Sequence, residues 1–145
     1  MITYAQQPTL ASRTTFTART WTFIGFIAVM SLATFFHFYH LEQEGFANLY
    51  YAAAVKSMSF DLRAFFFNSL DTGLFVTVDK PPVGLWVQVL SVWIFGYSGW
   101  ALLMPQALAG VFSVALLYWL VYRTFGAKAA FIAALVLAVS PISVA

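Results

Sequence analysis

Long apolar runs alternate with one polar stretch along the chain, and this pattern predicts helices. Residues 21–41 are apolar enough to cross a membrane, which takes about 20 helical residues at a rise of about 1.5 Å each. Residues 101–122 form a second such run, and residues 129–145 begin a third. We therefore predict three transmembrane helices over these ranges, the third of them truncated.

The stretch between the first two runs, residues 42–100, contains every acidic residue of the chain. Residues 48–58 (NLYYAAAVKSM) are rich in helix formers and predict a short helix along the membrane surface. Residues 83–95 are apolar but short, and segments of roughly 10–14 residues are more often interfacial or re-entrant than spanning. Asp71-Thr72-Gly73 predicts a turn. The three aromatics at 65–67 suit either interfacial anchoring or a packed core.

Basic residues indicate how the helices cross the membrane. Arg13 and Arg19 lie in a polar leader, residues 1–20, that we expect to be flexible and cytoplasmic. The predicted turn at 123–128 contains two more basic residues. It lies on the same side of the membrane as Arg13 and Arg19 only if residues 83–95 do not span the membrane. We therefore place 42–100 on the outer side of the membrane, as an external loop of a multi-pass protein. A secretory signal is the alternative, but the apolar run exceeds the roughly 7–15 residues of a cleaved signal.

Composition supports the membrane assignment. The chain is 62% apolar and 8% charged, whereas soluble proteins are roughly 45–50% apolar and about 25% charged. This balance excludes a soluble domain and predicts an all-α, polytopic membrane protein. Seven basic residues are too scattered for a nucleic-acid patch, so we expect membrane lipids and no nucleic acid as partners. The absence of cysteine excludes disulfides and thiolate metal sites.

The motif Asp79-Lys80-Pro81-Pro82 lies at the end of the polar stretch, and no charged residue follows until Arg123. The prolines fix φ and stiffen the entry to the next helix. A carboxylate there suits a divalent cation or a substrate, and a lysine ammonium suits a phosphate. The alternative is a charge pair that merely marks the membrane boundary.

The same loop holds other titratable and aromatic candidates. Glu44 and Asp71 offer a general base or metal ligand, or they simply keep the loop solvated. Tyr50 and Tyr51 suit either stacking on a sugar ring or anchoring at the membrane interface. Two histidines spaced three apart, at positions 37 and 40, are a weak metal signal and suit the interface better.

Three segments carry a resemblance to a known family. They are YYAAAVKSM (50–58), VDKPPVGLWVQVLSVWIFG (78–96) and LMPQALAGVFSVALLYWLVYRTFG (103–126). They resemble the N-terminal part of GT-C glycosyltransferases, specifically family 39 with the protein O-mannosyltransferases and the lipid A aminoarabinose transferase. The variant GFANLYY (45–51) is similar to a bacterial, mannosyltransferase-like branch. The resemblance covers most of 45–141 and implies the N-terminal fragment of a larger protein.

The resemblance implies a helical bundle whose first external loop carries juxtamembrane helices and the active site. It implies transfer of a sugar from a polyprenyl-phosphate carrier to an acceptor at the outer face. Asp79 matches an acid implicated in metal or donor contact, and Lys80 a lysine near the carrier phosphate. The family's acidic pair falls on Ala47 and Asn48, neither of which is acidic.

Several expectations follow from this match. Asp79, Asp71 and Glu44 are the candidates for the missing catalytic base, and Asp79 is the candidate metal ligand. Lys80, Asn48, Tyr50 and Tyr51 are the residues expected to bind the lipid-linked sugar donor. A divalent cation and the remainder of the full-length chain are the other expected partners.

A different class of function stays open at this point. The same scaffold would serve a non-catalytic protein that binds the carrier lipid or takes part in an assembly. A transporter is weaker, because no charged residue interrupts the predicted spans.

Overall fold

The structure, a computed structural model, describes residues 11–39, 41, 43 and 45–140, with side chains from Thr20 onward. This part of the chain forms six helices: α1 (Ala11–Phe38), α2 (Leu49–Phe60), α3 (Leu62–Phe66), α4 (Pro82–Phe95), α5 (Gly99–Phe125) and α6 (Ala127–Ala138). Its only β pairing is an isolated antiparallel bridge between Ser69 and Thr77. The predicted all-α fold class is confirmed.

Two of the predicted boundaries are wrong. α1 begins at Ala11, so residues 11–20 are helical rather than part of a leader. The turn expected over 123–128 is reduced to Gly126, whose φ of +83° ends α5 and starts α6. Glycine adopts this left-handed conformation without steric cost, which explains how so short a connection reverses the chain.

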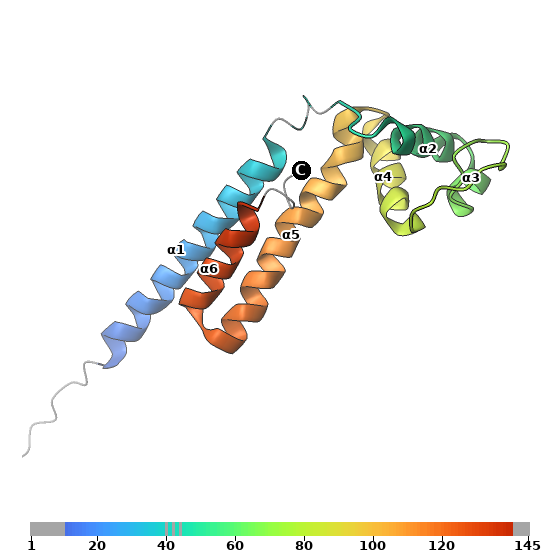
Figure 1. The fold of residues 1–145 in the computed structure, drawn as a ribbon. Helices are drawn as coiled ribbons and strands as arrows, with labels where there is room; N and C mark the ends of the chain where they lie inside the picture. Colours follow the sequence, from blue (N-terminus) through green and yellow to red (C-terminus); the bar gives the residue numbers. More distant parts are fainter. Residues whose placement is uncertain (1–10, 40, 42, 44, 141–145) are drawn as a thin grey trace, which may run out of the picture.

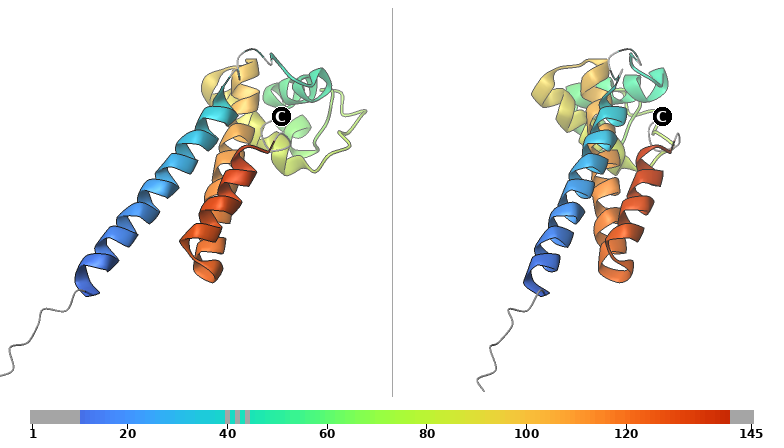
Figure 2. Two further views of the ribbon diagram at one scale, coloured as in Figure 1. Left: turned by 60° about the vertical axis from the view of Figure 1, so that its left-hand side comes forward. Right: turned by 90° about the vertical axis from the view of Figure 1, so that its left-hand side faces the viewer.

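Helices α1, α5 and α6 lie side by side as an elongated bundle (Figure 1). α1 ends, and α5 begins, at the end of the bundle that also carries α2, α3 and α4. The turn between α5 and α6 lies at the opposite end, as do the first residues of α1 (Figures 1 and 2). We call α2, α3, α4 and the connection at residues 67–81 the cap.

Two helices of the bundle are long and apolar enough to cross a membrane, α1 from Thr20 to Phe38 and α5 over its whole length. Only 17% and 22% of their apolar windows are buried inside the protein. A core helix of a soluble protein would be mostly covered, so this apolar surface indicates an environment of lipid or of further apolar helices. The chain is an all-α membrane protein. α4 and α6 are shorter apolar helices, about 21 and 18 Å long.

Small residues allow the bundle helices to approach closely. The buried cluster between them, the bundle cluster, consists of Val29, Ala33, Val114, Tyr118, Ala130, Ala134 and Ala138. Gly110 faces the ring of His37, and a Cβ at Gly110 would overlap that ring. His37 is therefore buried against α5, with Nδ1 donating to the Ala33 carbonyl at 2.8 Å. Its expected place at the membrane interface stays a prediction, and His40 lies outside the described residues.

Indole hydrogen bonds hold the cap together. Trp86 Nε1 donates to the Phe65 carbonyl at 2.7 Å, and Trp93 Nε1 donates to the Ser59 carbonyl at 3.0 Å. The Phe65 ring packs against both indoles. Phe65 is thus packed inside the cap, whereas Phe66 and its neighbour at position 67 are exposed. α4 is fixed to α2 and α3 by these contacts.

A second buried cluster, the cap cluster, fills the space between the cap and the start of α5. Its members are Ala52, Ala54, Val55, Met58, Val78, Leu85, Val89, Val92, Ala101 and Leu102. The start of α5 also receives the connection from α1, because a Cβ at Gly99 would overlap the Gly45 backbone. Glycine at position 99 therefore allows this backbone contact.

Candidate functional site

The connection between α3 and α4 folds back on itself as a hairpin over residues 68–78. The Val78 N–H donates to the Asn68 carbonyl at 2.8 Å, and the Leu70 N–H donates to the Val76 carbonyl at 2.8 Å. The turn predicted at Asp71 is confirmed by a bond from the Leu74 N–H to the Asp71 carbonyl at 3.3 Å. The hairpin delivers the chain directly to the Asp79-Lys80 motif.

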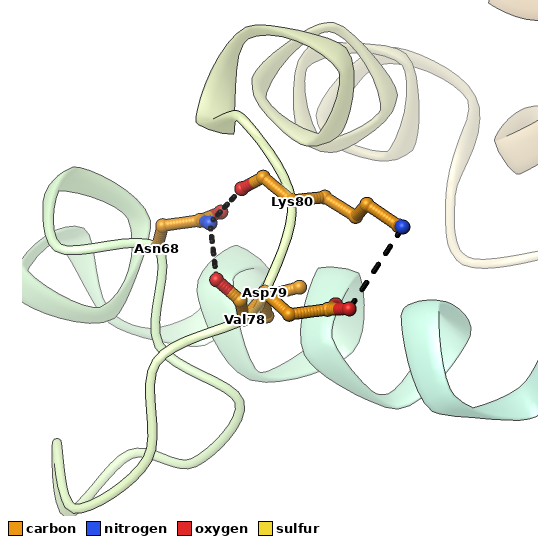
Figure 3. Close-up of polar contacts among 4 residues, drawn as sticks. All are labelled: Asn68, Val78, Asp79 and Lys80. Atoms are coloured by element: carbon orange, nitrogen blue, oxygen red, sulfur yellow. Dashed lines mark hydrogen bonds and ion pairs between the residues drawn. The ribbon is translucent and has the colours of Figure 1, made fainter.

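Asn68 fixes the backbone at that motif (Figure 3). Its side-chain amide donates to the Lys80 carbonyl at 2.9 Å and to the Val78 carbonyl at 3.5 Å. The residue is 8% exposed and has a φ of +54°, a left-handed conformation that asparagine tolerates better than most residues. Sequence reasoning missed Asn68, because its bonds reach residues ten and twelve positions away.

Asp79 and Lys80 form an exposed ion pair, with Lys80 Nζ 3.8 Å from Asp79 Oδ2 (Figure 3). Their side chains are 66% and 57% exposed, so solvent screens the attraction and the pair contributes little to stability. Pro81 and Pro82 follow at the N-cap and first position of α4. The backbone of the motif is therefore held, while both charged groups remain available to a ligand.

A cleft of about 260 Å³ opens beside this motif, between the start of α2, the first turns of α4 and the start of α5. It is lined by Phe46, Ala47, Asn48, Tyr51, Ala52, Lys80, Pro81, Gly84, Leu85, Gln88, Leu102, Leu103 and Gln106. Three of the predicted substrate-binding residues, Lys80, Asn48 and Tyr51, thus meet in one cleft. Tyr50 and Asp79 are not among the lining residues; the Tyr50 ring packs edge-on against Tyr51.

The start of α2 shapes one wall of the cleft. Asn48 is the N-cap, and its Oδ1 accepts the Tyr50 N–H at 3.0 Å. Ala47 has a φ of +52°, an uncommon conformation for a residue with a Cβ. The two positions on which the resemblance places an acidic pair therefore hold a strained backbone and a helix cap.

The first turns of α4 form another wall, which sequence reasoning missed. A Cβ at Gly84 would meet no atom within 4 Å, so this glycine leaves open space in the cleft. Gln88, one turn later, is 6% exposed and its Oε1 has no hydrogen-bond partner among the described residues. Gly84 and Gln88 are four positions apart and therefore lie on one face of the helix. This spacing is visible in the sequence and would have identified them as residues of one surface.

Asp71 closes the hairpin. Its Oδ1 accepts the Phe75 N–H at 3.2 Å, and its Oδ2 accepts the Val76 N–H at 2.9 Å. Desolvation pushes the pKa of this carboxyl up, but the backbone N–H groups outweigh it and lower the pKa below the ordinary value of 3.8. Both oxygens are thus engaged within the loop, and Asp71 is not among the cleft-lining residues. Its catalytic role stays a prediction, and so does that of Glu44, which lies outside the described residues.

Acidification is expected to open the hairpin through Asp71. Because the folded pKa is depressed, the stabilisation is present above the unfolded value of 3.8 and is lost as the pH falls through the folded pKa. The amide signals of Phe75 and Val76 in nuclear magnetic resonance spectra should shift with a midpoint below 3.8. The D71N variant should abolish this shift. A midpoint at or above 3.8, or an unchanged shift in D71N, would contradict the assignment.

A divalent cation at Asp79 was tested against the side chains that surround it. One exposed carboxylate, already paired with a lysine, does not by itself make a cation site. Within the described part of the chain, no group of three His, Cys, Asp or Glu side chains gathers to hold a metal. Metal contact by Asp79 stays a prediction.

Comparison with known proteins agrees with this picture. Residues 79–145 match the family described as dolichyl-phosphate-mannose-protein mannosyltransferase. The chain is 54% identical over 119 residues to "Putative mannosyltransferase YycA" of Bacillus subtilis (strain 168). It is 45% identical over 119 residues to "Putative mannosyltransferase YkcB" of the same organism. No solved structure matches.

The helical bundle, its uncovered apolar surface and the cleft at one end define a membrane protein with a candidate ligand cleft between the cap and the start of α5. Residues 79–145 match that family, and most of the chain is similar to the two mannosyltransferase-like relatives. The aligned residues are 82% of this chain and 17% of each relative, so the chain corresponds to a fragment of those proteins. The resemblance found in the sequence is confirmed at this level.

Proposed function

We propose that the chain forms part of a membrane glycosyltransferase that moves a sugar from a polyprenyl-phosphate carrier to an acceptor at the outer face. The observation that carries the proposal is the meeting of Lys80, Asn48 and Tyr51 in one cleft next to an apolar bundle. The names of the two relatives support sugar transfer in general. The carrier's apolar tail would lie against the bundle, and its phosphate would lie at the cleft.

Lys80 would hold the carrier phosphate. Among the described residues its ammonium is engaged only by a weak, exposed pairing with Asp79, so its N–H donors remain available to the singly charged phosphodiester of the donor. The N-terminus of α2 opens on the same cleft, and the partial positive charge of a helix N-terminus favours an anion. Both features stabilise the phosphate more as it leaves with additional negative charge.

Transfer requires a base for the acceptor hydroxyl. The bond between the sugar's anomeric carbon and the phosphate oxygen breaks, and a bond to the acceptor oxygen forms. The acceptor's proton passes to a carboxylate, and the carrier phosphate departs. Asp79, adjacent to Lys80 and free of backbone bonds that would occupy its oxygens, is the strongest described candidate for that carboxylate.

The arrangement of the helices supports the proposed orientation. The α5–α6 turn, beside which Arg123 and Lys128 lie, is at the end opposite the cap, and α1 starts at that same end (Figure 1). Basic residues favour the cytoplasmic side. A cytoplasmic N-terminus in a multi-pass bacterial plasma-membrane protein then leaves the cleft outside.

A second candidate function rests on a specific observation. Among the described residues that line the cleft, none is acidic. A protein that binds the carrier lipid without turning it over needs the lysine and the apolar surface but no base. Binding of a polyprenyl phosphate by wild-type protein without any sugar transfer would favour this function.

Replacing Lys80 by alanine tests the proposed function. Because a hydrogen bond to a charged group contributes about 1.5–3 kcal/mol, we expect K80A to bind a polyprenyl phosphate about 10- to 100-fold more weakly. Affinity is measured by titration calorimetry with the protein in lipid nanodiscs. K56A is the matched control, because Lys56 lies over the Tyr97 ring and does not line the cleft. Equal affinity of K80A and wild type would remove the phosphate site from this cleft.

A further inference from the structure

Gln88 is a buried polar side chain in the wall of the cleft. It is 6% exposed, and its Oε1 lacks a hydrogen-bond partner among the described residues. Buried acceptors in proteins are nearly always paired, because an unpaired one has lost its bonds to water without replacement. An unpaired amide in the wall of a cleft therefore indicates a ligand.

The position of Gln88 relates it to the phosphate site. Gly84 lies one helical turn before it, about 6 Å along the axis of α4, and Lys80 precedes the helix on the same side of the cleft. Because the space above Gly84 is open, a ligand held at Lys80 meets no side chain there on its way to Gln88. The terminal torsion of glutamine is soft, so the amide turns toward the cleft at little cost.

The unpaired atom defines the chemistry of the ligand. The amide oxygen accepts hydrogen bonds, and an ionised phosphate has only acceptor oxygens, so phosphate does not satisfy Gln88 Oε1. A hydroxyl both donates and accepts, so it bonds the amide whichever way the soft terminal torsion turns it. A ligand group that carries hydroxyls and lies within reach of the phosphate therefore fits Gln88.

We propose that Gln88 accepts a hydrogen bond from a hydroxyl of the sugar attached to the carrier phosphate, and so selects the sugar-loaded carrier over the empty one. This inference rests on the proposed function, which assigns the phosphate to Lys80. It adds a second recognition point in the cleft, and it gives the protein a means to release the carrier after transfer.

Ser91 provides a matched control. It lies on α4 and is 5% exposed. Like Gln88 Oε1, its Oγ has no hydrogen-bond partner among the described residues. It does not line the cleft. A purely structural effect of an unpaired buried group should appear at both positions, whereas recognition should appear only at Gln88.

The experiment compares two probes, a short-chain polyprenyl phosphate with and without a mannosyl group. The protein in nanodiscs is titrated with each, as wild type, Q88L and S91A. We expect Q88L to bind the mannosylated probe about tenfold more weakly, the usual effect of one lost hydrogen bond, and the free phosphate unchanged. S91A should match wild type for both probes.

A third probe makes the test independent of the folding of Q88L. The third probe is a mannosyl polyprenyl phosphate that lacks the one sugar hydroxyl bonded by Gln88. Wild type should bind this deoxy probe about tenfold more weakly than the complete probe, whereas Q88L should bind the two equally. Three results would overturn the inference alone: Q88L loses equal affinity for the mannosylated and the free phosphate, Q88L loses no affinity, or S91A loses as much affinity as Q88L. Wild type that binds neither polyprenyl phosphate would overturn the proposed function and the inference together.

Discussion

Replacement of Asp79 by asparagine is expected to slow sugar transfer by about 100-fold or more, because a general base contributes roughly 10²- to 10⁴-fold to such a step. Asparagine has nearly the same shape but does not take up the acceptor's proton. Binding of the carrier should be unchanged or slightly tighter, since the Lys80 ammonium, 3.8 Å from the carboxylate, loses its competing partner.

The measurement follows release of mannose from a mannosyl polyprenyl phosphate, with carrier affinity determined in parallel. D61N is the matched control: the Asp61 carboxylate accepts the Arg63 N–H at 2.8 Å as the N-cap of α3 and lies outside the cleft lining. Transfer by D79N at the wild-type rate would reject Asp79 as the base and leave Glu44 and Asp71 as candidates.

The second large effect is expected from Gly84. Leucine at this position would project into the cleft and exclude the ligand, so carrier affinity should fall by more than about 100-fold, since filling the site removes several contacts at once. The helix itself should be unchanged or slightly more stable, because Gly84 lies in the first turn of α4, where glycine costs less than the about 1 kcal/mol of a helix interior. A Cβ at Gly84 meets no atom within 4 Å, so its first carbon adds no clash.

Loss of binding together with an unchanged or higher thermal midpoint separates this effect from misfolding. V87L is the control, since Val87 is a half-exposed residue of α4 that does not line the cleft. G84A should fall between wild type and G84L. Wild-type affinity in G84L would show that the carrier binds elsewhere.

The elements that the sequence predicted well are those determined by local pattern. The apolar run of α5 and the helix after Pro81 follow from residues within one segment. The turn at Asp71 follows likewise from residue types that bond their own neighbours. The start of α1 was misplaced because residues 11–20 are polar, and polarity indicates exposure rather than the absence of a helix.

The parts of the site that escaped prediction depend on contacts between segments. Asn68 acts on Lys80 through a bond across the hairpin, and no pattern around Asn68 indicates that partner. Gln88 and Ser91 are the two polar residues of an otherwise apolar helix, a pattern that suits a membrane interface as well as a cleft. Only the packing of α4 against α2 and α5 distinguishes these cases, because it buries the amide and leaves Gly84 open.

The two buried clusters have no residue in common, although α5 contributes to both. Such separate cores tend to open as distinct cooperative units rather than in one transition. Ala52, Leu85 and Leu102 of the cap cluster also line the cleft, whereas no member of the bundle cluster does. The free energy of binding a ligand in the cleft is therefore expected to be linked more directly to the ordering of the cap than to the packing inside the bundle.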